Sequence, residues 1–378
     1  MLGIRVVEDA AALAAHVSAW EDLAADALDP NPFYEPWMLL PALETFGRGT
    51  RLQFVLAYAE RRGAPPLLCG FFPLERVSSY RGLPVRHVRL WRYLHCFLGT
   101  PLVRRGYAKQ CVRSLGEWLA KDPRGAAAME WREVTGDGRF YAALTDALDD
   151  GGTATFRSYR RERAMLCRLA DGETYLERAL PGASRKEFRR LERRLGEGAP
   201  LAYRTLESAA DAPRWIDDFL ALEAAGWKGR GGSALACNEG GVFFRRAALE
   251  ASRRGRLMML ALLRDGQPIA MKCNFLAREG SFAFKIAYDE SFARYSPGTL
   301  LELENIRAFH RSAALQWMDS CAAPEHFMAN RLWLDRRPLV DLIAATGRTH
   351  GNLVVSSLSL LHWAKRSLRP GAPAAATP

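Results

Sequence analysis

The chain has 378 residues, 49% of them hydrophobic and 25% charged, a globular composition that excludes a largely disordered protein. Its formal net charge of +11 predicts a surface that attracts phosphates, nucleic acid or anionic lipid, without choosing among them. The seven cysteines form no Cys-x-x-Cys pair and the seven histidines show no metal-ligand spacing, so we expect no metal site and no disulfide framework.

The N-terminal segment MLGIRVVEDAAALAAHVSAW lacks the basic start and apolar run of a signal peptide. No apolar run approaches the roughly 20 residues that cross a bilayer. We therefore expect a cytoplasmic protein, either free or bound peripherally at the inner face of the membrane.

Strands and helices alternate in the first part of the chain. LQFVLAYAE is rich in strand-forming residues, and GYAKQCVRSLGEWLAK places Val112, Leu115 and Leu119 on one side of a helix. The predicted strands are 52–60, 66–77, 85–94, 126–134, 153–160 and 164–169, and the predicted helices are 106–121 and 139–150.

The second part begins near Ser184 with the basic helix SRKEFRRLERRLGEG. The glycine-rich GWKGRGGSALACNEGG is either a mobile cover or a plain connector. The predicted helices are 184–198, 212–227, 242–255 and the one that begins near 297, and the predicted strands are 201–206, 256–265, 267–277, 281–289 and 315–321. Residues 54–75 and 257–277 are similar strand–turn–strand segments, which favours two related α/β halves.

RYSPGTLLELENIRAFHR leaves a strand and starts a helix whose leucines pack inward. Ser296 fits the N-cap and Pro297 the first helical position, and Gly298 lets a ligand approach the backbone closely. Two interpretations follow, an ordinary cap or an anion site on free amides. The candidate anion-binding residues are Arg294, Ser296, Pro297, Gly298, Thr299 and Leu300.

The common nucleotide and hydrolase signatures are absent from the sequence. It contains no P-loop motif, no Rossmann glycine fingerprint after a first strand and no Gly-x-Ser-x-Gly elbow. The junction at 294–300 is therefore the main candidate for binding a phosphorylated ligand.

A strand meander followed by such a helix start resembles the GNAT acyltransferases. Several stretches are similar to the branch called CelD-like or BioF2-like acetyltransferases, which is related to the FemAB transferases. They are NPFYEPWMLLPAL, SRKEFRRLERRL, FLALEAAGWKGRGGSAL, YSPGTLLELENIR and MDSCAAPEHFMANRLW. The standard Gln/Arg-x-x-Gly-x-Gly/Ala loop is reduced here to 294–299.

The resemblance implies an α/β (α+β) fold of tandem GNAT-like domains, each a mixed, mostly antiparallel sheet flanked by helices. We expect an N-terminal GNAT-like domain over 1–160 and the acetyltransferase domain over 161–349. A C-terminal helix and disordered tail would occupy 350–378, the tail by its composition. The resemblance also implies acyl-CoA as co-substrate, with its pyrophosphate held at 294–300.

Three residues are candidates for catalysis. Asp319 ends a strand and either caps the following turn or acts as base. His326 suits a general base by its ordinary pKa, although a loop histidine is more often structural. Tyr288 precedes the anion-binding candidates; pairing of Cys321 with His326 as a nucleophile is disfavoured, because direct attack is the usual route in GNAT enzymes.

Four residues are candidates for substrate binding. Lys285 and Tyr288 lie at odd spacing on one strand, so they should face opposite sides. Trp227 and Lys228 begin the glycine-rich segment, where Trp227 either covers substrate or anchors a helix end. Glu35 lies in an aromatic segment and could reach a cleft.

We therefore expect an acyl-CoA-dependent N-acyltransferase. The partner would be a small-molecule or lipid amine, such as a cell-envelope precursor, an amino sugar or a sphingoid base. Basic helices leave peripheral contact with an anionic membrane open, against the alternative of a solvated arginine face. A FemAB-like aminoacyl-tRNA-dependent transferase and a non-catalytic GNAT-fold binding protein are the alternatives, and only the former would bind nucleic acid, as tRNA.

Overall fold

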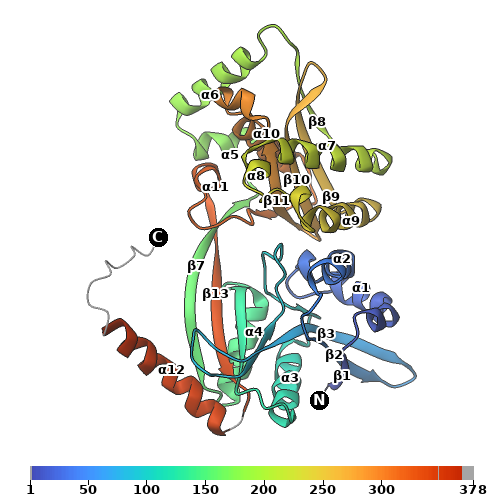
Figure 1. Cartoon of the computed structure of the whole chain (residues 1–378), viewed down its shortest axis with the longest axis vertical. Coiled ribbons are helices and arrows are strands. Elements are labelled where there is room, and N and C mark those ends of the chain that lie inside the picture. The colour runs from blue at the N-terminus through green and yellow to red at the C-terminus, as the bar shows by residue number, and fades with distance from the viewer. Residues whose placement is uncertain (1, 348, 368–378) are drawn as a thin grey trace. The chain divides into compact units, whose positions relative to one another are not determined.

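A computed structural model describes residues 2–347 and 349–367 and divides the chain into two compact units (Figure 1). The first unit holds the described residues of Met1–Leu43, Gly47–Glu162 and Arg337–Pro378. The second holds Glu44–Phe46 and Arg163–Arg336. Two long strands, β7 (Thr155–Cys167) and β13 (Asp335–Ala345), each contribute residues to both units.

The first unit is a mixed sheet with flanking helices. Its strands besides β7 and β13 are β1 (Gly3–Val7), β2 (Leu52–Arg61), β3 (Ala64–Val77), β4 (His87–Leu90), β5 (Leu102–Val103) and β6 (Ala128–Thr135). Its helices are α1 (Val17–Ala25), α2 (Pro36–Phe46, of which Glu44–Phe46 belong to the second unit), α3 (Ala108–Lys121), α4 (Arg139–Asp150) and α12 (Thr349–Ser367). The strand order is β1-β2-β3-β4-β6-β13, with β5 also on β3, and only the β4–β6 pairing is parallel.

The second unit is a sheet in the order β7-β12-β11-β10-β9-β8, with only β11–β12 parallel. Its strands besides β7 are β8 (Leu201–Thr205), β9 (Leu257–Arg264), β10 (Gln267–Ala277), β11 (Gly280–Tyr288) and β12 (Trp317–Asp319). Its helices are α5 (Gly172–Ala179), α6 (Gly182–Leu195), α7 (Ala212–Ala225), α8 (Trp227–Arg230), α9 (Gly240–Arg253), α10 (Pro297–Arg311) and α11 (Phe327–Leu332).

The two units repeat one topology. In each, four strands form an antiparallel meander, a helix follows, and the next strand joins parallel to the fourth. The helix is α3 before β6 in the first unit and α10 before β12 in the second. The predicted fold, two related halves with mostly antiparallel sheets and flanking helices, is confirmed.

Alternating side chains give the sheet of the second unit two apolar faces. Leu260 and Leu262 on β9 share a buried cluster with the helix α10, through Leu300, Leu303, Ile306 and Phe309. On the other face, Phe284 of β11 stacks on Phe244 of α9, with ring centroids 5.8 Å apart. Period-two alternation in the strands and the apolar stripe of α10 therefore fix where this helix starts relative to β11.

The parallel strands β11 and β12 pair over a short distance only. The paired residues are Gly280–Phe282 of β11 and Trp317–Asp319 of β12. Within the described residues, Ala283–Tyr288 has no strand partner on this edge, although it pairs with β10 on the other. Apart from the Ile286 carbonyl, which accepts a hydrogen bond from Lys228, its backbone groups on that edge are therefore available to a ligand.

Several element predictions need correction. The two strands predicted within 153–169 are the single strand β7 (Thr155–Cys167), and the strand predicted over 85–94 is reduced to β4. The strand β13 was not predicted, and because it pairs with β6, the residues from Arg337 onward lie in the first unit.

The compact units also differ from the predicted domains at their first boundary, which falls between 162 and 163. Within the C-terminal segment, α12 packs Val355 and Leu358 against Ala128 and Ile343 of its own unit. The predicted disordered tail lies outside the described residues.

Candidate active site

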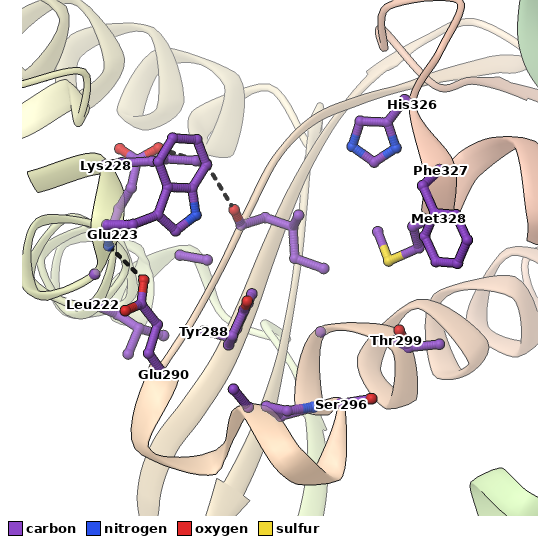
Figure 2. Close-up of a pocket in the computed structure, with 17 residues that line it drawn as sticks. Leu222, Glu223, Lys228, Tyr288, Glu290, Ser296, Thr299, His326, Phe327 and Met328 are labelled. Atoms are coloured by element: carbon purple, nitrogen blue, oxygen red, sulfur yellow. Dashed lines mark hydrogen bonds and ion pairs between the residues drawn. The ribbon is translucent and has the colours of Figure 1, made fainter. Parts of the chain in front are cut away.

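A cavity of about 400 Å³ opens in the second unit. Its walls include the end of β11, the start of α10, the end of α7, α8 and the start of α11. Figure 2 shows Ser296 and Thr299 at the α10 start, His326 and Met328 on one side, and Glu223 and Lys228 on the other. The unpaired end of β11 therefore meets the first turn of α10 at this cavity.

The first turn of α10 presents backbone amides to the cavity. Pro297 begins the helix, and Gly298 and Thr299 line the cavity. Among the described residues, neither the Gly298 nor the Thr299 N–H has a hydrogen-bond partner. These amides lie at the positive end of the helix dipole, where an anion is stabilised.

Two details of the predicted cap are wrong. Ser296 precedes the helix in a left-handed conformation (φ 53°, ψ 49°), and its side chain makes no cap hydrogen bond. The Leu300 N–H is not free, since it donates to the Ser296 carbonyl at 3.0 Å, and the Leu300 side chain is buried in the core. Without a side-chain cap, the Gly298 and Thr299 amides are left without a partner at the helix start within the described part of the chain.

Gly298 lies against the ring of Tyr288. A Cβ atom built on Gly298 would lie 3.3 Å from Cδ1 of Tyr288, which is closer than an ordinary contact. Tyr288 also lines the cavity. A side chain at position 298 would therefore intrude on the Tyr288 ring and on the cavity.

His326 faces the cavity from the start of α11 (Figure 2). Its Nδ1 accepts the Ala329 N–H at 3.2 Å, so the neutral ring carries its proton on Nε2. Burial, followed by the charge of Lys272, lowers the pKa of His326 and keeps the ring neutral. With Nδ1 occupied, this geometry offers a hydrogen-bond donor and no free ring nitrogen to act as a base.

A buried carboxylate holds two lysines beside the cavity. Glu223 on α7 is 2% exposed and accepts the Leu235 N–H at 2.9 Å on Oε2. Its Oε1 lies 3.1 Å from Nζ of Lys228 and 3.6 Å from Nζ of Lys285. The Lys228 ammonium also donates to the Ile286 carbonyl at 3.1 Å, so it ties α8 to the free part of β11.

A second cavity of about 260 Å³ adjoins the first and shares Lys228, Ile286, His326 and Met328 with it. It also contains Lys285 and the ion pair of Lys272 and Glu302. Together the two cavities lie along the part of β11 that does not pair with β12.

The structure brings most of the predicted residues together. Those that line the first cavity are Trp227, Lys228, Tyr288, Ser296, Pro297, Gly298, Thr299 and His326. Lys285 lines the second cavity and Tyr288 the first. Arg294 lines neither of these cavities; it is exposed and stacks on Tyr295, with its Cζ 4.7 Å from the ring centroid.

Asp319 and Glu35 lie outside both cavities. Asp319 is fully buried; its Oδ1 accepts the Cys321 N–H at 2.7 Å and lies 3.4 Å from Nη1 of Arg163. These contacts match the turn-capping interpretation of Asp319. Glu35 belongs to the first unit, where it is buried and accepts the Trp37 indole N–H at 2.7 Å.

The prediction missed the buried charges Glu223, Lys272 and Glu302. Each interrupts an apolar run, in FLALEAAGW, IAMKCNF and LLELENI respectively. A charged residue on the inward face of a helix or strand is rare unless it has a partner. That irregularity was the available signal; Lys228 follows Glu223 closely, but Lys285 is far from Glu223 in the sequence and Lys272 is far from Glu302.

Among the described residues, no group of three or more His, Cys, Asp and Glu side chains is placed to hold a metal ion. No helix in the described part of the chain is long and apolar enough to cross a membrane.

Comparison with known proteins gives one family match. Residues 182–328 match the family described as "Acetyltransferase (GNAT) domain". No curated protein matches the chain significantly. The matched range contains both the α10 start and the walls of the first cavity.

Solved structures share the fold over most of the chain. FemX covers 86% of this chain and 95% of its own at 9% identity, with a TM-score of 0.57. The C-terminal domain of a putative lysylphosphatidylglycerol synthetase from Agrobacterium fabrum covers 92% of this chain and 97% of its own at 11% identity, with a TM-score of 0.51. A conserved protein of unknown function from Bacteroides thetaiotaomicron covers 91% of this chain and 99% of its own at 13% identity, with a TM-score of 0.52. At these identities the likeness concerns the fold.

Proposed function

Because this chain carries a GNAT-type acetyltransferase domain over residues 182–328, we propose that it is an N-acyltransferase. In this proposal it moves an acyl group from a coenzyme A thioester to an amine. The amine would belong to a small molecule or a lipid, with cell-envelope precursors, amino sugars and sphingoid bases as the candidate classes.

The observation that carries the proposal is the junction of β11 and α10. The unpartnered amides of Gly298 and Thr299 open into the same cavity as the end of β11. Such amides suit a diphosphate, and the free edge of a strand suits an extended chain that contains amide groups. Coenzyme A combines these two features, a diphosphate and an amide-containing arm.

The chemistry needs a stabilised oxyanion and a neutral amine. The amine nitrogen forms a bond to the thioester carbon and loses one proton, the carbon–sulfur bond breaks, and the thiolate takes up a proton, so that an amide and a free thiol result. His326 has its Nε2–H free to donate to the carbonyl oxygen as charge develops there. We assign His326 this role instead of that of a general base.

Aminoacyl-tRNA is the alternative donor. The fold shared with FemX supports this donor as much as it supports acyl-CoA. Aminoacyl-tRNA also contains an activated acyl group, which is held as an ester in place of the thioester of acyl-CoA. In that case RNase treatment of the purified protein would abolish transfer, and acyl-CoA would release no thiol. A protein that only binds acyl-CoA would be stabilised by it and would release no thiol with any amine.

The proposal is tested by mass spectrometry of copurifying molecules, followed by thermal melting with coenzyme A and acyl-CoAs of increasing chain length. We expect coenzyme A to raise the melting temperature, with a graded response to the acyl chain. Thiol release with a pool of amines then distinguishes turnover from binding. No stabilisation by coenzyme A or any acyl-CoA would exclude the acyl-CoA proposal.

A further inference from the structure

Three lysines from three different elements line the second cavity. They are Lys228 of α8, Lys272 of β10 and Lys285 of β11. Their side chains are 24%, 5% and 16% exposed, so all three ammonium groups are largely removed from water. Isolated charges are costly in such surroundings, so each needs a counter-charge.

The described carboxylates supply too few counter-charges. Lys272 forms an ion pair with Glu302, in which Nζ of Lys272 lies 2.8 Å from Oε2 of Glu302. Lys228 and Lys285 share Oε1 of Glu223, at 3.1 and 3.6 Å. Three ammonium groups therefore face two carboxylates among the described residues around this cavity, which leaves one positive charge in excess.

Other charges near the cavity do not remove the excess. Asp319 is paired with Arg163, so this buried pair is neutral as a whole. His326 lines the cavity as well, and its neutral ring adds no charge.

The titration behaviour agrees with a positive cavity. Burial lowers the pKa of Lys285, Glu223 opposes this, and the neighbouring charge of Lys228 lowers it further. Burial also lowers the pKa of His326, and the charge of Lys272 adds to that effect. Burial is the largest cause of both shifts, and the charges of the neighbouring lysines act in the same direction.

We propose that this lysine cavity binds a carboxylate carried by the amine acceptor, so that the acceptor is an amino acid or a similar amine with a carboxylate close to its amino group. This inference rests on the proposed acyl transfer and narrows its acceptor class. A carboxylate neutralises the single excess charge, whereas a phosphate dianion would leave a buried negative charge in its place.

The position of the cavity assigns the carboxylate to the acceptor. Lys228, Ile286, His326 and Met328 form the boundary with the cavity that we assign to the donor. An acceptor with its carboxylate among the lysines can place its amine at this boundary, beside His326. Sphingoid bases, which lack a carboxylate, would not use this site.

The same lysines help the amine to react. The carboxylate of the acceptor raises the pKa of its nearby ammonium group, and pairing of that carboxylate with the lysines weakens this effect, so the ammonium pKa falls relative to the free acceptor. The amine therefore gives up its proton to solvent more readily and enters the reaction neutral, as attack on a carbonyl carbon requires. The reaction then needs no general base in this site, where Nδ1 of His326 accepts a hydrogen bond and the lining carboxylates Glu223 and Glu302 are paired with lysines.

The test compares amines that differ only in the carboxylate: L-alanine with ethylamine, and L-phenylalanine with 2-phenylethylamine. Thiol release from acetyl-CoA is measured for the wild type and for Lys285→Met, Lys285→Arg and the control Lys121→Met, which changes an exposed lysine on α3. Melting curves confirm that each variant is folded.

We expect the wild type to prefer at least one amino acid over its matched amine by at least tenfold in kcat/KM. Lys285→Met should lose this preference and shift the pH profile of kcat/KM to higher pH, Lys285→Arg should restore both, and Lys121→Met should change neither. Equal use of the matched pairs by the wild type, or a preference retained in Lys285→Met, would overturn the proposal. A lysine-dependent preference for succinyl-CoA over butyryl-CoA would also overturn it, since the carboxylate would then belong to the donor.

A binding measurement separates this inference from the proposed activity. Titration calorimetry with L-alanine and ethylamine, and with the phenyl pair, is done with coenzyme A present and needs no turnover. Binding of an amino acid that falls at least tenfold in Lys285→Met supports the carboxylate site even if no thiol is ever released. No amino acid binding, or equal binding by the wild type and Lys285→Met, contradicts it.

Discussion

Lys272 of β10 and Glu302 of α10 form an ion pair of 2.8 Å with side chains only 5% and 2% exposed. The other carboxylate oxygen of Glu302 accepts the Asn305 amide at 2.9 Å and the Trp333 indole N–H at 3.1 Å. This network ties α10, whose first turn we assign to the donor, to the sheet beneath it. Its integrity should therefore affect the stability of the second unit.

Replacing one member of this pair leaves the other charge buried without its partner. We expect Glu302→Leu to lower the free energy of unfolding by about 3–5 kcal/mol, since loss of one partner of a buried pair has that effect. The double variant Lys272→Met with Glu302→Leu should recover part of the loss. Urea denaturation measures both.

Glu304→Leu is the matched control on the same helix. Glu304 pairs with Arg307 and with the 60% exposed Arg311, so its loss should cost about 1 kcal/mol or less. A loss for Glu302→Leu no larger than that for Glu304→Leu would contradict the description of the network.

Asp319 is expected to act on stability and not on chemistry. Asp319→Asn removes the charge that faces the buried Arg163, which should lower the free energy of unfolding by about 3–5 kcal/mol. The turnover of the protein that remains folded should change by only about tenfold or less, because Asp319 lines neither cavity.

Thiol release and urea denaturation on the same sample separate the two effects of Asp319→Asn. Wild-type stability combined with a loss of turnover beyond about 100-fold, the scale expected for a lost catalytic group, would assign Asp319 a catalytic role.

The sequence predicted the fold well because it depends on local patterns. Period-two strands, the Gly/Pro turn between β9 and β10 and the Pro297 start of α10 are all visible in a few neighbouring residues. The strand β13 was missed because no local signal marked DRRPLVDLIAA, and its pairing with β6 spans about half of the chain.

His326 predicts a pH-dependent contribution to stability. Its pKa is lowered on folding, so the unfolded chain, with a pKa near 6.5, binds the proton more readily. The contribution of His326 is therefore present above pH of about 6.5 and declines as the pH falls below it. His326→Asn keeps a side chain that can cap α11 but removes this titration.

Melting temperatures from pH 8 to pH 5 check this prediction. The wild type should lose more stability on acidification than His326→Asn, and the control His350→Asn, at an exposed site on α12, should behave as the wild type. Parallel pH curves for the wild type and His326→Asn would show that the ring is not held neutral.

The site was only partly predictable. The segment 296–299 was identified because Ser-Pro-Gly-Thr is a helix-start signal, and Lys228 because it lies beside glycines. Lys228 lies near Glu223 in the sequence, but Lys285, which shares the same carboxylate, is more than 50 positions away, so no local pattern reveals the sharing. The left-handed Ser296 was likewise hidden, since serine ordinarily caps with its side chain.

The proposed acyl transfer depends most on donor binding at the start of α10. The direct measurement is the affinity of coenzyme A for the wild type, for Gly298→Trp and for the control Gly182→Trp, by titration calorimetry. Gly182 lies in the first turn of α6, where an added Cβ meets nothing within 4 Å, whereas at Gly298 it already approaches Tyr288.

We predict that the wild type and Gly182→Trp bind coenzyme A equally well. Gly298→Trp should retain a cooperative melting transition and lose at least tenfold in affinity, about 1.4 kcal/mol. Equal affinity in wild type and Gly298→Trp, or no binding of coenzyme A by the wild type, would contradict the assignment of this helix start as the donor site.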